Sequence, residues 1–249
     1  MKVLSIDIDY IMSNNCNLYG PLFRGSNAKR GWNEIYDCSD LTDTNFYIDQ
    51  SNLIFTFNAF LSALKNNPKV RFGYEHDAIL FDLKDETDIE LINIDHHNDI
   101  FHGSWDYIEE YDMVRNHEVI REGNWGIWLI IKEKLKKWTW IGNDSSANWE
   151  LEVEKTLEFF QDYKRVTKEE YTFEDYNFDY VYVCLSPQYI PQCYWHYFAM
   201  FMSAYEHYSG NDAIIHQHSF GHSILHKEVN DEILYKRSDG RGPVFSSGI

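Results

Sequence analysis

A five-residue segment, DHHND at positions 95–99, follows an apolar run and places two carboxylates and an imidazole at alternate positions. Side chains alternate faces on an extended backbone, so we expect Asp95, His97 and Asp99 to converge while His96 points away. Carboxylate oxygens and imidazole nitrogens suit divalent ions such as Mn²⁺, Fe²⁺ or Zn²⁺. The spacing therefore predicts a metal site, with His96 supporting it by a hydrogen bond. A solvated turn is the alternative.

A second acidic pair, Asp7 and Asp9, ends the apolar N-terminal run in the same way. Two like charges at one buried strand end are unfavourable unless a cation neutralises them. A third strand end carries His76, which follows a short apolar run at 70–74. Two acidic strand ends predict a shared cation or a cation pair, and two ions about 3.5 Å apart would activate a water molecule near neutral pH.

The elements that must position these residues alternate between strands and helices. Apolar and β-branched runs predict buried strands, and apolar positions three or four apart predict helices. The predicted strands cover residues 2–9, 70–74, 88–95, 112–120 and 178–185. The predicted helices cover residues 49–65, 125–137, 156–164 and 192–208, and the last turns of the second contain Lys132, Lys134, Lys136 and Lys137. A long irregular region is predicted for residues 13–47.

Apolar strands that alternate with helices predict an α/β fold with three layers, α/β/α, around a mostly parallel central sheet. In such sheets ligands bind at the carboxyl ends of the strands, which is where Asp7, His76 and Asp95 fall. A length of 249 residues suits a single domain, residues 1–249. The sequence therefore predicts a metal site at one edge of one sheet.

The chain is acidic, with 22 Lys and Arg against 40 Asp and Glu and a net charge of −18. This charge disfavours nucleic acid and anionic membranes as partners, and it favours a cationic substrate or simply solubility. No apolar stretch reaches the roughly 18 residues of a membrane span, and no export signal is predicted. Four cysteines without a C-x-x-C pair fit a reducing cytoplasm. The composition is compatible with a homo-oligomer as well as with a monomer.

The segments SIDID at positions 5–9 and DHHND at 95–99 resemble the S-x-D-x-D and D-x-H-x-D metal signatures of the ureohydrolases, the superfamily of arginase and agmatinase. A DIDY segment near the N-terminus, a strand-end His, DHHND and the pair Asn124-Trp125 follow one another as in the peptide arginases. This resemblance covers roughly residues 2–12, 74–79, 92–102 and 121–128. It implies an arginase-like fold, two Mn²⁺ ions, and hydrolysis of arginine side chains to ornithine and urea in a ribosomally made precursor peptide.

The resemblance also implies a role for each matching residue. Asp95 and Asp7 would bridge the two ions, His76 and Asp99 would complete one site, and the remaining two ligands would complete the other. The six implied ligands are Asp7, Asp9, His76, Asp95, His97 and Asp99.

The chain departs from the arginase pattern in one respect. In arginases the S-x-D-x-D segment follows D-x-H-x-D, whereas here it comes first, so the strand order would have to be circularly rearranged. Residues 185–191 resemble the arginase stretch that follows the acidic pair, yet Val181 and Val183 stand where carboxylates would be needed. We therefore expect the N-terminal strand to have taken the metal-binding role.

Three residues are candidates for the chemistry itself. Asp99 is placed to accept a proton from the attacking water. His102 is a candidate proton shuttle beside the metal motif, and His117 and His196 are alternatives. Glu122 would bind the substrate guanidinium by a bidentate ion pair, or would serve as a carboxylate at a helix N-terminus. The histidines at 216, 218, 222 and 226 mix strand and helix spacings, so no second metal site is predicted there.

Other enzyme classes share parts of this pattern. The letters DHH at positions 95–97 match the name motif of the DHH phosphoesterases, which also use two Mn²⁺ ions. Against this class, no His precedes the N-terminal acidic pair, no glycine-rich phosphate-binding segment lies near the C-terminus, and the negative charge would repel phosphorylated substrates. An arginase-fold amidohydrolase or deacylase and a non-catalytic, metal-stabilised module are further alternatives.

Overall fold

A computed structural model describes residues 1–12, 47–101, 107–121, 123–143, 146, 149–173, 177–221 and 232–234. Most of the region predicted to be irregular, residues 13–46, lies outside this description. Two candidate catalytic residues, His102 and Glu122, also lie outside it. None of the helices in the described ranges is long and apolar enough to cross a membrane.

One sheet organises the described chain. Its spatial order is β5-β4-β3-β1-β6-β2-β7-β8, and the first seven strands of this order run parallel, whereas β8 pairs antiparallel with β7. The strands are β1 (Lys2–Asp7), β2 (Lys69–Gly73), β3 (Ile89–Asp95), β4 (Leu135–Gly142), β5 (Tyr163–Val166), β6 (Tyr180–Cys184), β7 (Ile214–His216) and β8 (Glu232–Leu234). The α/β class with a mostly parallel sheet is therefore confirmed.

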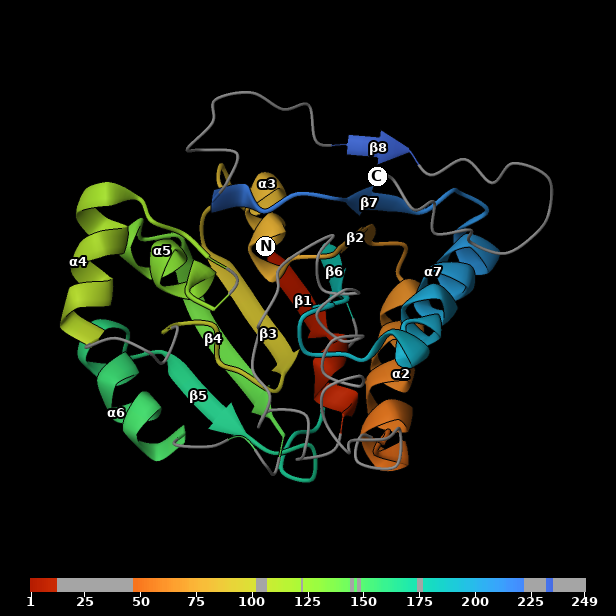
Figure 1. The fold of residues 1–249 in the computed structure, drawn as a ribbon, viewed down its shortest axis with the longest axis horizontal. Coiled ribbons are helices and arrows are strands. Elements are labelled where there is room, and N and C mark those ends of the chain that lie inside the picture. The colour runs from red at the N-terminus through yellow and green to blue at the C-terminus, as the bar shows by residue number, and fades with distance from the viewer. Residues whose placement is uncertain are drawn as a thin grey trace, which may run out of the picture.

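Helices cover both faces of the sheet (Figure 1). On one face lie α2 (Gln50–Leu64) and α7 (His196–Ser209), which contact each other and share one buried apolar core. The helices whose apolar residues join the second core are α3 (Leu80–Leu83), α4 (Tyr107–His117), α5 (Trp125–Ile131) and α6 (Trp149–Phe159). This arrangement agrees with the predicted three layers.

Strand β6 shows why the sheet needs helices on both sides. Its residues alternate between the two cores: Val181 and Val183 pack with α2 and α7, whereas Tyr180 and Tyr182 pack on the other face. All four side chains are fully buried. Because burying one such side chain contributes about 1.5–3 kcal/mol, a sheet with two apolar faces is stable only when both are covered.

The N-terminal strand lies at the centre of the sheet. β1 pairs with β3 on one side and with β6 on the other, with Ile6 beside Ile94 and Asp7 beside Cys184. Since these strands are parallel, their carboxyl ends meet at one edge of the sheet. The acidic end of β1 therefore lies next to the end of β3, where the DHHND segment begins.

The predicted strand at 112–120 is wrong, because helix α4 covers Tyr107–His117. Its apolar residues Ile108, Tyr111 and Val114 recur every three positions, which is the helical spacing. Acidic residues lie in its first turn and basic residues in its last turn, as the helix dipole favours. The helical period was the stronger pattern in this segment.

The predicted helix at 125–137 is too long. Helix α5 ends at Ile131, and strand β4 begins at Leu135, so the four lysines lie beyond the helix rather than in its last turns. Trp138 and Trp140 are fully buried where β4 runs between β3 and β5. Burial in a parallel sheet thus overrides the helix propensity of the lysines, of which Lys136 and Lys137 lie at the exposed start of the strand and the other two precede it. The helix predicted at 156–164 likewise ends at Phe159 and gives way to β5.

Candidate metal centre

Carboxylates and imidazoles from three strand ends converge at the carboxyl edge of the sheet. β1 supplies Asp7 and the turn after it supplies Asp9, the turn after β2 supplies His76, and β3 supplies Asp95. Their ligand atoms form two groups in which all atoms lie within 4.8 Å of one another. The first group consists of Asp7, His76 and Asp95. The second group consists of Asp9, Asp95 and His97.

The two carboxylates of the first group, together with that of Asp99, surround one nitrogen of His76. His76 Nδ1 lies 2.6 Å from Asp99 Oδ2, 3.1 Å from Asp95 Oδ2 and 3.3 Å from Asp7 Oδ2. The side chains are buried, with at most 6% of any of them exposed. Three carboxylates and an imidazole in so small a volume are a donor set for one divalent cation.

The second group shares Asp95 with the first. His97 Nδ1 lies 3.1 Å from Asp9 Oδ2 and 4.0 Å from Asp95 Oδ1. Asp95 therefore turns one oxygen toward His97 and its other oxygen toward His76. A carboxylate in this position can bridge two cations. Asp7, by contrast, joins only the His76 group, and its Oδ1 accepts the backbone N–H of Asp9 at 3.0 Å, so its bridging role stays a prediction.

Two buried atoms of the site make no hydrogen bond to the part of the chain that the structure describes. These are Asp9 Oδ2 and His76 Nδ1, although charged groups of the described residues lie within 3.3 Å of both. A buried polar atom without a partner is unfavourable, and such atoms are rare in folded proteins. One of them belongs to each ligand group. The residues present therefore fit a cation in each group.

The pKa values of the site residues agree with a role in binding a cation. Burial, followed by the charges of Asp99 and Asp7, raises the pKa of Asp95 to about 7. Burial also raises the pKa of both Asp7 and Asp9. Burial alone would lower the pKa of His97, but the Asp9 carboxylate, 3.1 Å from its ring nitrogen, raises it to about 10. Burial thus disfavours the ionised form of these carboxylates, and a bound divalent cation would favour that form.

Several neighbours fix the orientation of the ligands. Ser5 Oγ lies 2.6 Å from His76 Nε2, within hydrogen-bond distance on the side away from the carboxylates. Trp125 Nε1 donates to Asp99 Oδ2 at 2.6 Å, and the Ser186 hydroxyl donates to Asp7 Oδ2. Such contacts hold a ligand in the orientation that coordination requires. Sequence reasoning assigned none of these three residues a role, because their partners lie far away in the chain.

The backbone around the ligands is less extended than the predicted alternation of side chains on a strand would require. β1 ends at Asp7, and Asp9 lies in the 3-10 turn Ile8–Ile11. β3 ends at Asp95, and Asp99 has a positive φ of 53°. Asp95 and His97 share a ligand group, whereas Asp99 lies against His76, so the three side chains predicted to converge divide between two places. Tight turns after the two strands, not continuous extended segments, set these positions.

Some predicted residues do not reach the site. His117, at the end of α4, and His196, at the start of α7, are exposed, and neither borders the cavity described below. His216 is buried and bonds Asp82 through Nε2 at 3.0 Å, whereas His218 is exposed. Positions 222 and 226 lie outside the described residues. As predicted, His96 belongs to neither ligand group; its buried ring contacts the His97 ring.

A small cavity opens beside the ligand groups. Its volume is about 40 Å³, and it is bordered by Asp7, His76, His97 and Asp99 together with Phe101 and Tyr189. The cavity is large enough for a few water molecules or a small functional group. It gives a reacting group access to both ligand groups.

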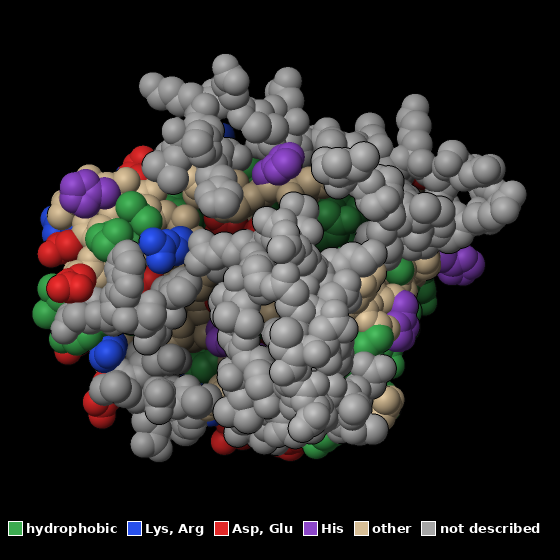
Figure 2. Space-filling view, in the orientation of Figure 1, with side chains coloured by type: hydrophobic (Ala, Val, Ile, Leu, Met, Phe, Trp, Pro, Cys, Tyr) green, Lys and Arg blue, Asp and Glu red, His purple; other side chains and the backbone are tan. Residues whose placement is uncertain are grey.

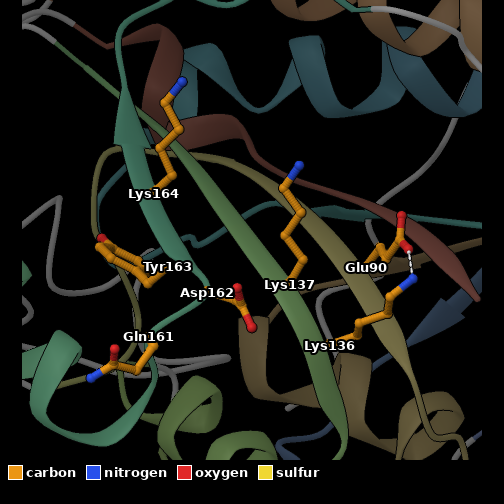
Figure 3. Close-up of a pocket in the computed structure, with 7 residues that line it drawn as sticks. All are labelled: Glu90, Lys136, Lys137, Gln161, Asp162, Tyr163 and Lys164. Atoms are coloured by element: carbon orange, nitrogen blue, oxygen red, sulfur yellow. Dashed lines mark hydrogen bonds and ion pairs between the residues drawn. The ribbon is translucent and has the colours of Figure 1, made fainter.

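A wider hollow of about 510 Å³ lies at the opposite edge of the sheet, where β3, β4 and β5 begin (Figure 3). Lys137 and Lys164 extend to the same side there, while Lys136 forms an ion pair with Glu90. Figure 2 shows acidic and basic side chains interspersed on the part of the molecule that carries α4. The described residues on that face therefore form no continuous basic surface of the kind that binds nucleic acid.

Helix α5 approaches the site so closely that only glycine fits at position 126. A Cβ on Gly126 would lie 2.1 Å from Trp138 Cη2 and 2.8 Å from the Asp99 carbonyl oxygen. We therefore expect Gly126→Ala to displace α5, to weaken the Trp125–Asp99 hydrogen bond and to lower Mn²⁺ affinity about 10- to 100-fold. Isothermal titration calorimetry would measure the affinity.

Gly210→Ala is the matched control for this substitution. A Cβ on Gly210 meets nothing within 4 Å, but its φ of +69° makes alanine unfavourable by about 1–2 kcal/mol. This variant should lose some stability and keep its Mn²⁺ affinity. Equal affinities for Gly126→Ala and wild type would show that α5 does not position Asp99.

Comparisons with protein-family models, curated proteins and solved structures found no match to this chain. Function is therefore inferred from the residues and their geometry. Two ligand groups that share one carboxylate, one of them fully buried and the other reaching the surface through His97, can hold divalent cations beside a small cavity. Such an arrangement suits hydrolysis.

Proposed function

We propose that the protein is a metal-dependent hydrolase with an arginase-like fold that converts arginine side chains of a peptide into ornithine and releases urea. The observation that carries this proposal is the position of Asp95, whose two oxygens face two separate imidazoles. A shared carboxylate is what a pair of closely spaced ions requires. Two Mn²⁺ ions fit the oxygen-rich donor set.

The place of β1 in the sheet supports the resemblance to the ureohydrolases. Its acidic pair precedes the DHHND segment in the sequence, yet β1 lies directly beside β3 in space. Strand β6, on the other side of β1, buries Val181 and Val183 in the core and contributes the Ser186 hydroxyl to Asp7 instead of a carboxylate. The reversed order of the two motifs along the sequence is therefore compatible with a complete set of metal ligands in one site.

In the proposed reaction, water adds to the guanidinium carbon, the bond from that carbon to the side-chain nitrogen breaks, and the leaving amine takes up a proton. Bound divalent ions would supply a lowered water pKa and polarisation of the reacting carbon. Asp99 borders the cavity, and Trp125 holds its carboxylate, so Asp99 is placed to accept the proton of the attacking water.

The alternatives make different demands on the site. A phosphoesterase needs positive side chains around the substrate phosphate, and no Lys or Arg of the described residues borders the cavity. A deacylase would act on a neutral amide and would need only one ion. A metal-stabilised binding module would bind ions without turnover.

The experiment is to incubate the Mn²⁺-loaded protein with a mixture of arginine-containing peptides. We expect each converted arginine to lower the peptide mass by CH₂N₂ and to release one urea, because the reaction replaces a guanidinium with an amine. Mass spectrometry and a urea assay measure the two products independently. Free arginine and peptides with lysine in place of arginine are the controls.

Each outcome selects one function. No urea from any arginine peptide would contradict the proposal. Hydrolysis of a dinucleotide would support the phosphoesterase, and release of acetate from an acetyl-lysine peptide would support the deacylase. Stoichiometric metal binding without any of these activities would support the binding module.

A further inference from the structure

Two aromatic rings complete the border of the cavity beside the ligands. Phe101 follows the DHHND segment, and Tyr189 follows strand β6. The Tyr189 ring lies 4.7 Å from the His97 imidazole, measured between ring centroids, at an interplanar angle of 42°. Tyr189 is therefore in contact with a candidate ligand and also faces the cavity, where a substrate group would enter.

The segment that carries Tyr189 is fixed at both ends. At its start, the Ser186 hydroxyl donates to Asp7, and the Ser186 N–H donates to the Tyr74 carbonyl at 3.2 Å. At its end, Trp195 Nε1 donates to the Ile190 carbonyl at 2.9 Å. A ring held in this way loses little conformational entropy when a ligand binds it.

Phe101 is also held in place by its neighbours. Only 9% of its side chain is exposed, and its ring contacts Tyr107 edge-on at a centroid distance of 6.2 Å. It also contacts Phe159 of α6 at 6.3 Å. The cavity thus has two pre-positioned aromatic borders, and the other side chains that border it are carboxylates, imidazoles and the Ser186 hydroxyl.

We propose that Tyr189, with Phe101, provides an aromatic surface on which the planar guanidinium group of the substrate stacks, so that Tyr189 is a specificity-determining residue for a planar cation. This inference rests on the function proposed above. A guanidinium is flat and delocalised, so it stacks on aromatic faces as well as pairing with carboxylates. The aromatic rings distinguish it by its planar shape and by its positive charge, because a cation is attracted to the negative face of a ring.

This combination selects against other substrate groups. A neutral acetamide gains no cation–π attraction from the rings, and an anionic phosphate is disfavoured at the negative face of an aromatic ring. A primary ammonium shares the charge but has no plane to stack. The cavity volume of about 40 Å³ admits only the head of a side chain, so the rest of the peptide would stay outside.

The test compares Tyr189→Leu, which removes the ring, with Tyr189→Phe, which keeps it. We expect Tyr189→Leu to raise KM for an arginine peptide about tenfold, with a smaller change in kcat, because a cation–π contact is lost. Tyr189→Phe should recover most of the affinity. Tyr208→Leu is the matched control, since Tyr208 lies on α7, is 55% exposed and does not border the cavity.

Metal content must be measured for each variant, because Tyr189 contacts His97. A loss of Mn²⁺ that parallels the loss of activity in Tyr189→Leu would show that the ring supports the ligand instead of the substrate, and would overturn the inference. A KM for Tyr189→Leu within twofold of wild type, with urea still released, would overturn it as well. That result would leave the proposed function intact.

A binding measurement separates this inference from the proposed function. If no peptide yields urea, calorimetry with N-acetylarginine amide and with the neutral citrulline analogue still tests the surface. Tighter binding of the arginine compound by the wild type, lost in Tyr189→Leu and kept in Tyr189→Phe, would support a guanidinium-binding surface. Equal affinities for the two compounds, or binding of neither, would overturn it.

Discussion

Asp95→Asn should abolish binding of both metal ions and lower urea formation more than 100-fold. Asp95 is the one residue common to the two ligand groups, so its loss weakens both sites at once. Asparagine keeps the shape of the side chain but has one neutral carbonyl oxygen where aspartate has two charged ones. Substitution of residues that only support a ligand already weakens metal binding about 10- to 100-fold, and loss of a bridging ligand should exceed that.

Metal analysis after dialysis, together with the urea assay, measures both effects. Asp85→Asn is the control, because Asp85 is an exposed carboxylate and belongs to neither ligand group. Asp9→Asn should differ from Asp95→Asn in removing one ion only, since Asp9 belongs to one group. Two retained ions in Asp95→Asn would refute the bridging assignment.

The location of the site could be predicted because strand ends are visible in the sequence. Apolar runs end at Asp7 and Asp95, and parallel strands bring such ends to one edge. The sequence does not show which strands are neighbours, and the position of β1 between β3 and β6 is a tertiary feature. The grouping of Asp7 with Asp95 follows from that position.

The contacts that orient the ligands were beyond sequence reasoning for a similar reason. Ser5 and His76 are 71 positions apart, and Ser186 and Asp7 are 179 apart. A serine or a tryptophan at such a distance carries no local pattern that marks it as a partner. Trp125 occurs in a segment that resembles the peptide arginases, but its hydrogen bond to Asp99 depends on how α5 packs.

The errors in secondary structure have one cause. Lysines at 132–137 suggested a helix end, yet burial of Trp138 and Trp140 makes the following segment a strand. Residues 112–120 suggested a strand, yet an amphipathic helix covers most of them. In both segments the local pattern was ambiguous and tertiary packing decided the outcome.

Mn²⁺ should stabilise the protein strongly at pH 8.0 and weakly at pH 5.5. The folded-state pKa of Asp95, about 7, exceeds its ordinary value of 3.8, and that of His97, about 10, exceeds 6.5. A group whose pKa is raised by folding stabilises the fold below its unfolded pKa, and this contribution is lost as the pH rises through the folded pKa. Without metal, both groups therefore make the stability fall as the pH rises from about 4 toward 10.

Metal binding has the opposite pH dependence, because an ion must displace the protons that these groups hold. At pH 8.0 and an Mn²⁺ concentration of about 100 times Kd, each bound ion should contribute about 2.7 kcal/mol, or about 5–11 °C in Tm for a chain of this size. Thermal unfolding followed by circular dichroism, with and without Mn²⁺ at each pH, measures the difference. The release of protons on binding can be counted by calorimetry in buffers of different ionisation enthalpy.

Asp95→Asn provides the internal control for this pH dependence. Because asparagine cannot ionise, the metal-free variant should lose less stability than the wild type between pH 5.5 and 8.0. At pH 8.0 the Tm of the metal-free variant should be higher than that of the wild type by at least about 2–4 °C, which is the shift that about 1 kcal/mol produces. With Mn²⁺ the order should reverse, because only the wild type gains from the ions. Equal stabilisation by Mn²⁺ at both pH values would mean that the ions bind without displacing protons, and would place them away from Asp95 and His97.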